Sequence, residues 1–267
     1  MNKKYELTDD TIVVSGQCLH RIQACREFGN VKAGDLGGFI KSEENLSHHN
    51  NCWVSYNACA TQNARVYGNA YIDKYAWVCG NAEVYGNAKI VGHAVVYGNA
   101  KIYGNACIYE NARVYGNSKI FGHAQICEDA RIYGNAKVYD NSRISENAKI
   151  FGHARVYEDG QVFDDAQVHG NTQIYGNARV LDAAEIYGDA SVGEDAQVWG
   201  NAKIYGDAQI YGYAQVSGNA KVFRHTHIYG NSRIFGNAQI SGITWVCGTA
   251  KIGGDVKLDS GTWTKWD

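Results

Sequence analysis

Aliphatic residues recur at every sixth position over most of the chain. From Val54 to Leu258 this register contains 35 positions, and 33 of them are Val or Ile. Four residues after each one stands a second small residue, which is Ala in 26 of the 35 cases. No insertion interrupts the register between residues 54 and 262. Because the faces of an α-helix recur about every 3.6 residues, a period of six excludes an ordinary helix and predicts short strands.

Each six-residue unit has the pattern of one strand followed by one tight turn. In residues 100–105, AKIYGN, the apolar Ala and Ile alternate with Lys and Tyr, as in a strand with one buried side. Gly-Asn follows, and both residues tolerate the positive φ that tight turns need. Val and Ile suit a pleated, half-buried surface, and Ala leaves room for walls to close around a narrow interior. We therefore expect four-residue strands joined by two-residue turns.

The repeated unit resembles the hexapeptide repeat of left-handed parallel β-helices. Its first position is Val or Ile, the second is variable, the third is Gly and the fourth is Asn or Asp, followed by Ala and then by Lys, Arg or Gln. The resemblance implies an all-β fold in which three six-residue units make one triangular coil. It predicts a single-stranded left-handed parallel β-helix, a triangular solenoid of about 12 coils. The segment GDLGGFIKSEENLSHHNNCWV, residues 34–54, also resembles the entry sequence of uncharacterised YdcK-like hexapeptide proteins of bacteria and phages.

The solenoid is expected to occupy residues 36–262, because three weaker units begin at Leu36, Ser42 and His48. The open ends of a solenoid expose strand edges and core, so caps are expected. Residues 1–35 are predicted to form a small N-terminal β cap, with TIVVSG and QCLHRIQAC as strands. At the other end, residues 263–267 are expected to be a tail or cap, with Leu258, Trp263 and Trp266 covering the last coil.

Composition narrows the function classes. The formal net charge is −2, which gives no overall attraction to nucleic acid or to an anionic membrane. No apolar run is long enough to span a bilayer, and no apolar stretch follows the basic start MNKKYELTDD. The eight cysteines contain no CxxC pair, so we expect free thiols, a reducing compartment and no metal site. These features favour a cytoplasmic protein that binds neither membrane nor nucleic acid.

A coil of three units sorts the outward residues into columns. One column contains tyrosines flanked by basic residues, and a second column is also aromatic. The first column consists of Tyr67, Tyr85, Tyr103, Phe121, Tyr139, Tyr157, Tyr175, Gly193, Tyr211 and Tyr229. The second consists of Tyr97, Tyr115, Tyr133, Phe151, His169, Tyr187, Tyr205 and Phe223. Rings one coil apart are expected to lie against each other, which leaves few ring faces for bases and argues against single-strand nucleic-acid binding. Two interpretations remain open: ladders that stabilise neighbouring coils, and docking faces for a partner or a second copy.

The strongest break in the repeat lies in VFRHTHIYG, residues 222–230. In one unit Arg224 replaces Gly, His225 replaces Asn and His227 replaces the usual Lys or Gln. Asp207 precedes His225 by three units, so the two are expected on the same corner, where a carboxylate orients an imidazole and raises its basicity. Asp207 and His225 are the candidate catalytic pair, with Arg224 and His227 as binding residues. The alternative is a solvated surface contact.

A second break is Gly193, which interrupts the tyrosine column. We expect a notch there beside Ser191 and Glu194, flanked in the column by Tyr175 and Tyr211, and able to admit a ligand or a partner side chain. The acidic residues at the corners are alternative cation ligands, although pairs alone supply too few oxygens for a divalent ion.

Three functions remain open. The unbroken register and the lack of an extruded loop favour a rigid scaffold or interaction protein with binding surfaces on the aromatic and basic faces. The family resemblance implies an acyltransferase that uses acetyl-CoA, acts as a homotrimer and employs a histidine as general base. The resemblance to phage proteins implies a protein that sequesters a host factor or small molecule.

Overall fold

The structure, a computed structural model, describes residues 3–265, which fall into two compact units that divide after Asp129. Nearly all regular structure is β, and the described residues contain one short 3₁₀ helix, η1 (Glu43–Asn45). The predicted all-β parallel β-solenoid of about 12 turns is confirmed. Among residues 3–265, no helix has the length and hydropathy needed to cross a lipid bilayer.

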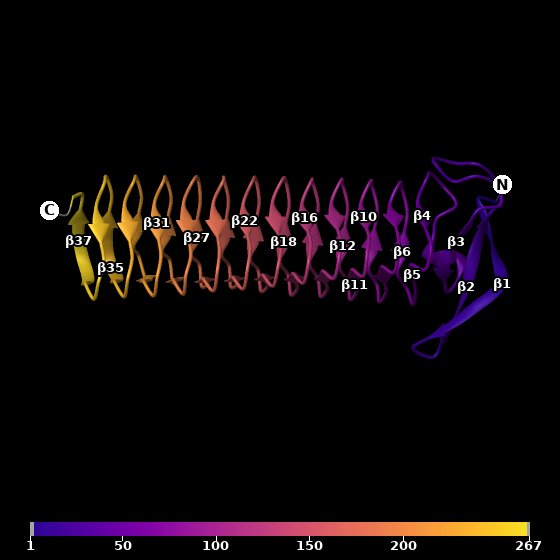
Figure 1. Ribbon diagram of the computed structural model, residues 1–267, viewed down its shortest axis with the longest axis horizontal. Helices are drawn as coiled ribbons and strands as arrows, with labels where there is room; N and C mark the ends of the chain where they lie inside the picture. Colours follow the sequence, from indigo (N-terminus) through magenta and orange to yellow (C-terminus); the bar gives the residue numbers. More distant parts are fainter. Residues whose placement is uncertain (1–2, 266–267) are drawn as a thin grey trace. The chain divides into compact units, whose positions relative to one another are not determined.

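Unit 1 begins with two long antiparallel strands and continues into short parallel ones (Figure 1). Its strands are β1 (Tyr5–Val14), β2 (Gln17–Ala24), β3 (Leu36–Ile40), β4 (Trp53–Val54), β5 (Cys59–Ala60), β6 (Arg65–Val66), β7 (Tyr71–Ile72), β8 (Trp77–Val78), β9 (Glu83–Val84), β10 (Lys89–Ile90), β11 (Val95–Val96), β12 (Lys101–Ile102), β13 (Cys107–Ile108), β14 (Arg113–Val114), β15 (Lys119–Ile120) and β16 (Gln125–Ile126).

Unit 2 consists of short parallel strands and ends in two longer ones. Its strands are β17 (Arg131–Ile132), β18 (Lys137–Val138), β19 (Arg143–Ile144), β20 (Lys149–Ile150), β21 (Arg155–Val156), β22 (Gln161–Val162), β23 (Gln167–Val168), β24 (Gln173–Ile174), β25 (Arg179–Val180), β26 (Glu185–Ile186), β27 (Ser191–Val192), β28 (Gln197–Val198), β29 (Lys203–Tyr205), β30 (Gln209–Ile210), β31 (Gln215–Val216), β32 (Lys221–Phe223), β33 (His227–Ile228), β34 (Arg233–Ile234), β35 (Gln239–Val246), β36 (Lys251–Ile252) and β37 (Lys257–Trp263).

Within each unit, the strands from β4 to β36 pair in parallel with the strand one coil away, so residues separated by three units stand side by side. The offset differs at the two ends, where Phe39 is paired with Cys59 and Thr244 with Gly261. Within unit 1, Ile102 of β12 is paired with Ile120 of β15. The amide of Tyr103 donates to the carbonyl of Ile120 at 3.0 Å, and that of Asn105 donates to Gly122 at 2.7 Å. Most strands are only two residues long, shorter than the four predicted. The flanking residues still bond to the next coil, but the chain already bends toward the turn there.

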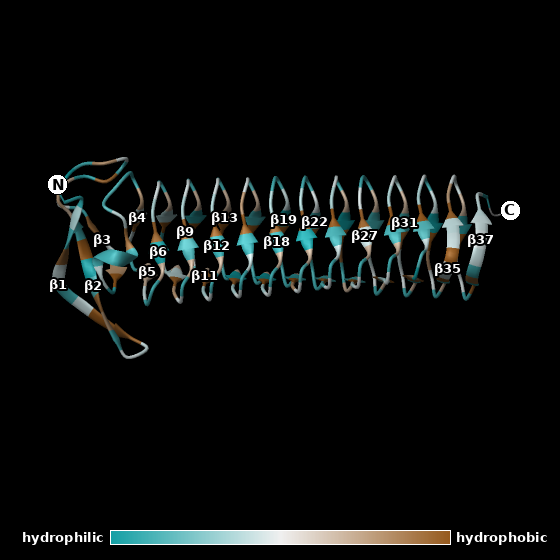
Figure 2. Ribbon diagram, turned by 180° about the vertical axis from the view of Figure 1, so that it is seen from behind, coloured by the Kyte–Doolittle hydropathy of each residue, from teal (hydrophilic) through white to brown (hydrophobic). Residues whose placement is uncertain are grey.

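The interior of both units is the predicted one. Every Val and Ile of the six-residue register from Val54 to Ile252 is at most 1 % exposed, and the alanines between them are equally buried. Hydrophobic and hydrophilic residues consequently alternate along the coils (Figure 2). Full burial of such side chains contributes about 1.5–3 kcal/mol each for Val or Ile. Leu258, at the end of the register, is half-buried.

The turns explain both the glycines and the acidic corners. The first turn residue has a left-handed backbone, as at Gly104 with φ of 72°, where a Cβ would lie 2.9 Å from the amide nitrogen of Gly122. At other turns a carboxylate replaces Gly at similar φ and accepts the amide proton of the residue one coil later. Glu158 does so from Gly176 at 2.7 Å, and Glu194 from Gly212 at 2.8 Å. These corner acids therefore have a structural role.

The two ends differ from the repeat. In unit 1, β1 and β2 form an antiparallel hairpin over the two segments expected to be strands, except that Ser15 and Gly16 form the turn and Cys25 lies beyond β2 (Figure 1). β2 pairs antiparallel with β3, which in turn pairs in parallel with β5 of the solenoid. In unit 2, Trp263 lies half-buried in β37, which pairs in parallel with β35. Trp266, the other expected capping residue, lies outside the described residues. No disulfide links any of the eight cysteines, all of which the structure describes.

Removing a corner carboxylate is expected to weaken the solenoid, whereas keeping an oxygen acceptor is not. Glu158→Ala should lower the free energy of unfolding by about 0.5–1.5 kcal/mol, because the amide of Gly176 loses its partner. Glu158→Gln should behave like the native protein, since Gln62 already accepts from Gly80 in the same way at 2.7 Å. Urea midpoints compare the three proteins. Equal midpoints for the Ala and Gln variants would contradict the capping role.

Candidate functional site

The aromatic columns are stacks of rings, as expected. In unit 1, ring centroids of Tyr67, Tyr85, Tyr103 and Phe121 follow one another at 4.8, 4.9 and 4.9 Å, with interplanar angles of 2–4°. In unit 2, Tyr187, Tyr205 and Phe223 repeat this geometry at 4.8 Å. Neighbouring rings therefore cover each other's faces and present their edges outward. Aromatic pairs of this kind contribute about 0.5–1.5 kcal/mol beyond their buried area.

Charged side chains flank the unit 1 column. Glu83 accepts a hydrogen bond from the Tyr67 hydroxyl at 3.0 Å and pairs with the Lys101 ammonium at 3.0 Å. Burial, together with Glu83, raises the pKa of Tyr67 to about 12, so this phenol stays protonated. Arg65 and Lys119 occupy the same flanking row and are exposed. We call Arg65, Lys101, Lys119 and the four stacked rings the aromatic–basic face.

The candidate catalytic pair lies together in unit 2. The Nδ1 atom of His225 is 3.3 Å from the Oδ2 atom of Asp207, as the spacing of three units predicts. Their side chains are 69 % and 54 % exposed, so water solvates the contact. If Nδ1 carries the proton toward Asp207, the Nε2 lone pair faces outward as a base. The geometry therefore suits an oriented but open imidazole.

The neighbouring residues of this corner differ in surroundings. Arg224 adopts the left-handed turn with φ of 62°, and its guanidinium lies 5.9 Å from the Phe223 ring centroid. His227 stacks on Trp245 with centroids 4.2 Å apart and an angle of 8°. Burial and, secondarily, the charge of His225 lower the pKa of His227. Trp245 was not singled out from the sequence, although it follows His227 by three units and so falls in the same column.

The notch expected at Gly193 is closed. The ring of Tyr175 lies over Gly193, and a Cβ added to this glycine would overlap the ring. The expectation was wrong because a column position without a side chain leaves space that the preceding ring fills. Phe235 covers Gly253 in the same way. Ser191 and Tyr211 therefore do not border an open notch at this position.

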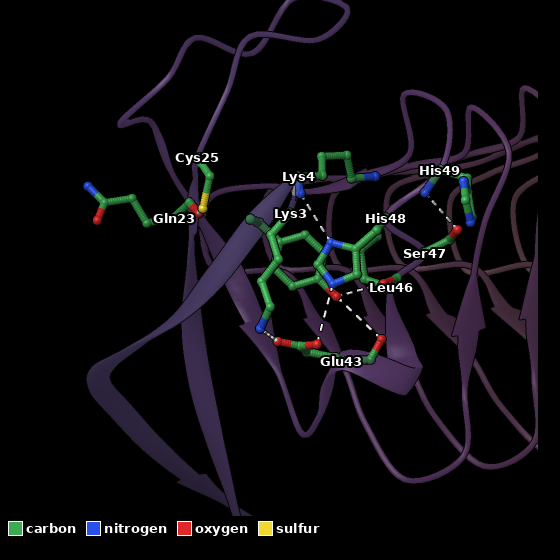
Figure 3. Close-up of polar contacts among 10 residues, drawn as sticks. Lys3, Lys4, Gln23, Cys25, Glu43, Leu46, Ser47, His48 and His49 are labelled. Atoms are coloured by element: carbon green, nitrogen blue, oxygen red, sulfur yellow. Dashed lines mark hydrogen bonds and ion pairs between the residues drawn. The ribbon is translucent and has the colours of Figure 1, made fainter. Parts of the chain in front are cut away.

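A second polar cluster joins the start of the chain to the first coil of unit 1 (Figure 3). Glu43 pairs with the Lys3 ammonium at 2.7 Å and lies 3.4 Å from Nε2 of His48. The backbone amide of Lys4 donates to Nδ1 of His48 at 3.3 Å, so Nε2 carries the proton of the neutral ring. The hydrogen bond from Lys3 is the main reason that the pKa of Glu43 is lowered.

Both ring nitrogens of His48 are thus occupied, and its ring also stacks on Tyr5 at 4.3 Å. Tyr5 is fully buried and donates its hydroxyl proton to the carbonyl of Leu46 at 2.6 Å. The cluster therefore anchors the first strand instead of offering a base. Sequence reasoning missed it, although Glu43 and His48 lie in the entry segment SEENLSHHN.

Among the described residues, one group combines three possible metal ligands within 4.8 Å: Glu110, Cys127 and Glu128. The carboxylate of Glu110 already accepts the amide proton of Glu128 at 2.9 Å, and Cys127 is buried. This arrangement is the same corner capping that the other turn acids perform.

Two segments of the chain, residues 130–146 and 173–194, match the model of the YdcK Beta solenoid repeat. Over these two segments the chain is similar to the YdcK solenoid repeat, in agreement with the parallel β-solenoid of the structure. No curated protein matches the chain. The second matched segment contains Tyr175, Ser191 and Gly193, so these three candidate residues lie within a part of the chain that matches the solenoid repeat. His225, Asp207 and the aromatic–basic face of unit 1 lie outside both matched segments.

The stacked, partly buried His227 is expected to make stability depend on pH. Its pKa lies below the ordinary value of 6.5 in the folded protein, so the unfolded chain binds more protons as the pH falls below 6.5. The contribution of this residue to stability should therefore be fully present above pH 6.5 and should decrease below it.

His227→Phe preserves a ring against Trp245 and should remove the decrease in stability at acidic pH that His227 causes. Denaturant midpoints between about pH 5 and pH 8 measure the effect. His153→Asn, which restores the usual turn residue at another position, serves as the control and should keep the native pH profile. An equal decrease in the denaturant midpoint at acidic pH in His227→Phe and in the native protein would contradict the account.

Proposed function

We propose that this protein is a rigid interaction scaffold that docks an acidic, partly apolar protein surface on the aromatic–basic face of unit 1. The observation that carries the proposal is the column of four stacked rings flanked by basic residues. The rings are held in register by the backbone ladder, so little side-chain entropy is lost when a partner binds. Aromatic residues and Arg are the side chains that most often anchor protein interfaces.

The charge of the face determines the kind of partner. Lys101 is partly neutralised by Glu83, whereas Arg65 and Lys119 form no ion pair with another described residue. With three basic residues and one acidic residue, the flanking row attracts acidic surfaces and steers their approach. Exposed charges are screened by salt, so binding should weaken as ionic strength rises.

An array of short synthetic peptides tests this function. The full-length protein should bind peptides that combine Asp or Glu with aromatic residues, and less strongly at high salt. The double variant Arg65→Glu and Lys119→Glu should lose about tenfold in affinity, because two attractions become repulsions. The matched control is Lys251→Glu with Lys257→Glu, which makes the same charge change at exposed sites of unit 2.

Equal losses of peptide affinity in both double variants would show that only the net charge matters, and would reject the aromatic–basic face as the binding site. Binding of peptides without regard to their acidic residues would also reject it. Far-ultraviolet circular dichroism of each variant checks that the solenoid is retained.

The contact between Asp207 and His225 favours a second candidate function, an acyltransferase that takes acetyl-CoA and acts as a trimer. An imidazole whose Nδ1 faces a carboxylate at 3.3 Å has its Nε2 oriented for proton abstraction from an acceptor. Titration calorimetry with acetyl-CoA and with CoA tests this candidate.

The candidate predicts micromolar binding and an acyl transfer that His225→Ala abolishes but His153→Ala does not. Absence of heat at two temperatures would reject it. Retained transfer in His225→Ala would reject the assignment of the base.

A further inference from the structure

A cavity of about 690 Å³ lies in unit 1 between the segment that follows β2 and the adjoining coils. One wall is formed by residues 29–31 and 35–36. The other wall is the outer surface around β4, β7 and β10, with Trp53, Tyr71 and Lys89 from successive coils. The volume is in the range of small-molecule sites in proteins. None of its residues belongs to the aromatic–basic face or to the corner of His225.

The wall contributed by residues 28–36 is held in place by its own contacts. Phe28 and Val31 exchange two backbone hydrogen bonds of 3.0 and 2.9 Å. The carboxylate of Asp35 accepts the amide proton of Lys32 at 2.8 Å. The Phe28 ring packs edge-on against Trp53, with centroids 5.4 Å apart. The cavity is therefore formed before any ligand arrives, which reduces the entropy lost on binding.

The lining mixes aromatic rings with neutral polar groups. Amides come from Asn30, Asn51 and Asn69, and hydroxyls from Ser55 and Tyr71. Amides and hydroxyls both donate and accept, which matches the alcohol groups of a sugar. The apolar C–H face of a sugar ring packs on aromatic side chains such as Tyr56.

The charges of the lining disfavour an anionic ligand. Lys89 is its only cation, and Asp35 supplies one negative charge. Arg is the residue most enriched where phosphate is bound in bidentate fashion, and the described residues of the lining include no Arg. A neutral, hydroxyl-rich ligand therefore suits this cavity better than a phosphate ester.

Several groups at the cavity have no partner in the protein. The side chains of Asn30, Tyr56 and Lys89 make no hydrogen bond or ion pair with another described residue. Tyr56 is 67 % exposed and has φ of 50°, a left-handed conformation that a bulky residue seldom adopts. Burial raises the pKa of Tyr71, whose phenol also has a hydrogen-bond partner in Ser55. Donors and an aromatic ring are thus available to a ligand.

We propose that this cavity binds a neutral mono- or disaccharide, with the sugar ring against Tyr56 and its hydroxyls bonded to Asn30 and Lys89. The site is separate from the proposed docking face, so either proposal can fail without the other. It gives the scaffold a specific small-molecule ligand at the end of the chain where the repeat begins.

Saturation-transfer NMR of the full chain with glucose, galactose, mannose, N-acetylglucosamine and their disaccharides identifies the bound sugar. Chemical shifts of the labelled protein then locate it, and the amides of Gly29 and Asn30 should move while that of Gly212 stays in place. Tyr56→Ala should weaken binding at least tenfold, and Lys89→Ala several-fold. Tyr213→Ala is the matched control, because Tyr213 is an exposed turn tyrosine, 63 % exposed, in unit 2.

Saccharide binding that both cavity variants weaken and the control keeps would support the proposal. No saturation transfer to any of these sugars would overturn it, as would shifts that map away from both walls of the cavity, residues 29–36 and the lining residues of β4, β7 and β10 with Tyr56. Tighter binding of inorganic phosphate or of a nucleotide than of every sugar would also overturn it. Melting temperatures confirm that each variant is folded. If Tyr56→Ala does not fold, Lys89→Ala still tests the proposal.

Discussion

The backbone hydrogen bond from one coil to the next is the interaction on which the rest of the structure depends. It places side chains separated by three six-residue units next to each other, as in the pair Ile102 and Ile120. Because the same offset recurs from β4 to β36, any residue repeated at this spacing becomes a column. The stacked tyrosines, the capped corner amides and the contact of Asp207 with His225 all follow from it. Changing the length of one coil would break every column that passes through it.

This regularity explains how much of the fold was predictable from the sequence. A contact between residues far apart in the chain normally cannot be predicted from a single sequence. A fixed period allows it to be predicted from the difference between the two residue numbers. The buried Val and Ile positions, the stacking of Tyr67 on Tyr85 and the approach of His225 to Asp207 were predictable for this reason. Prediction failed where no period applies. Tyr175 leans over Gly193 because of a side-chain rotation that the spacing does not determine, and the cavity depends on the non-repeating segment of residues 28–36.

Function in such a protein is confined to its surface, since the narrow interior is filled by Val, Ile and Ala. Two surfaces of unit 1 offer different chemistry. The aromatic–basic face is repetitive, which suits a macromolecule, whereas the cavity beside Trp53 is a pocket lined by polar and aromatic residues, which suits a small ligand. The matched family segments cover neither surface. The outer residues vary along the chain without disturbing the core, because the core depends on the inward Val, Ile and Ala positions.

Amide hydrogen exchange measured by NMR tests the coil ladder most directly. The amides of Tyr103 and Asn105 should exchange slowly, because each donates to the next coil, while that of Gly104 between them should exchange fast. At the corners, Gly212, whose amide is bonded to Glu194, should exchange more slowly than Gly206, whose amide has no such acceptor among the described residues. Uniform protection along residues 103–105, or equal rates for Gly206 and Gly212, would contradict the three-unit coil and its capped turns.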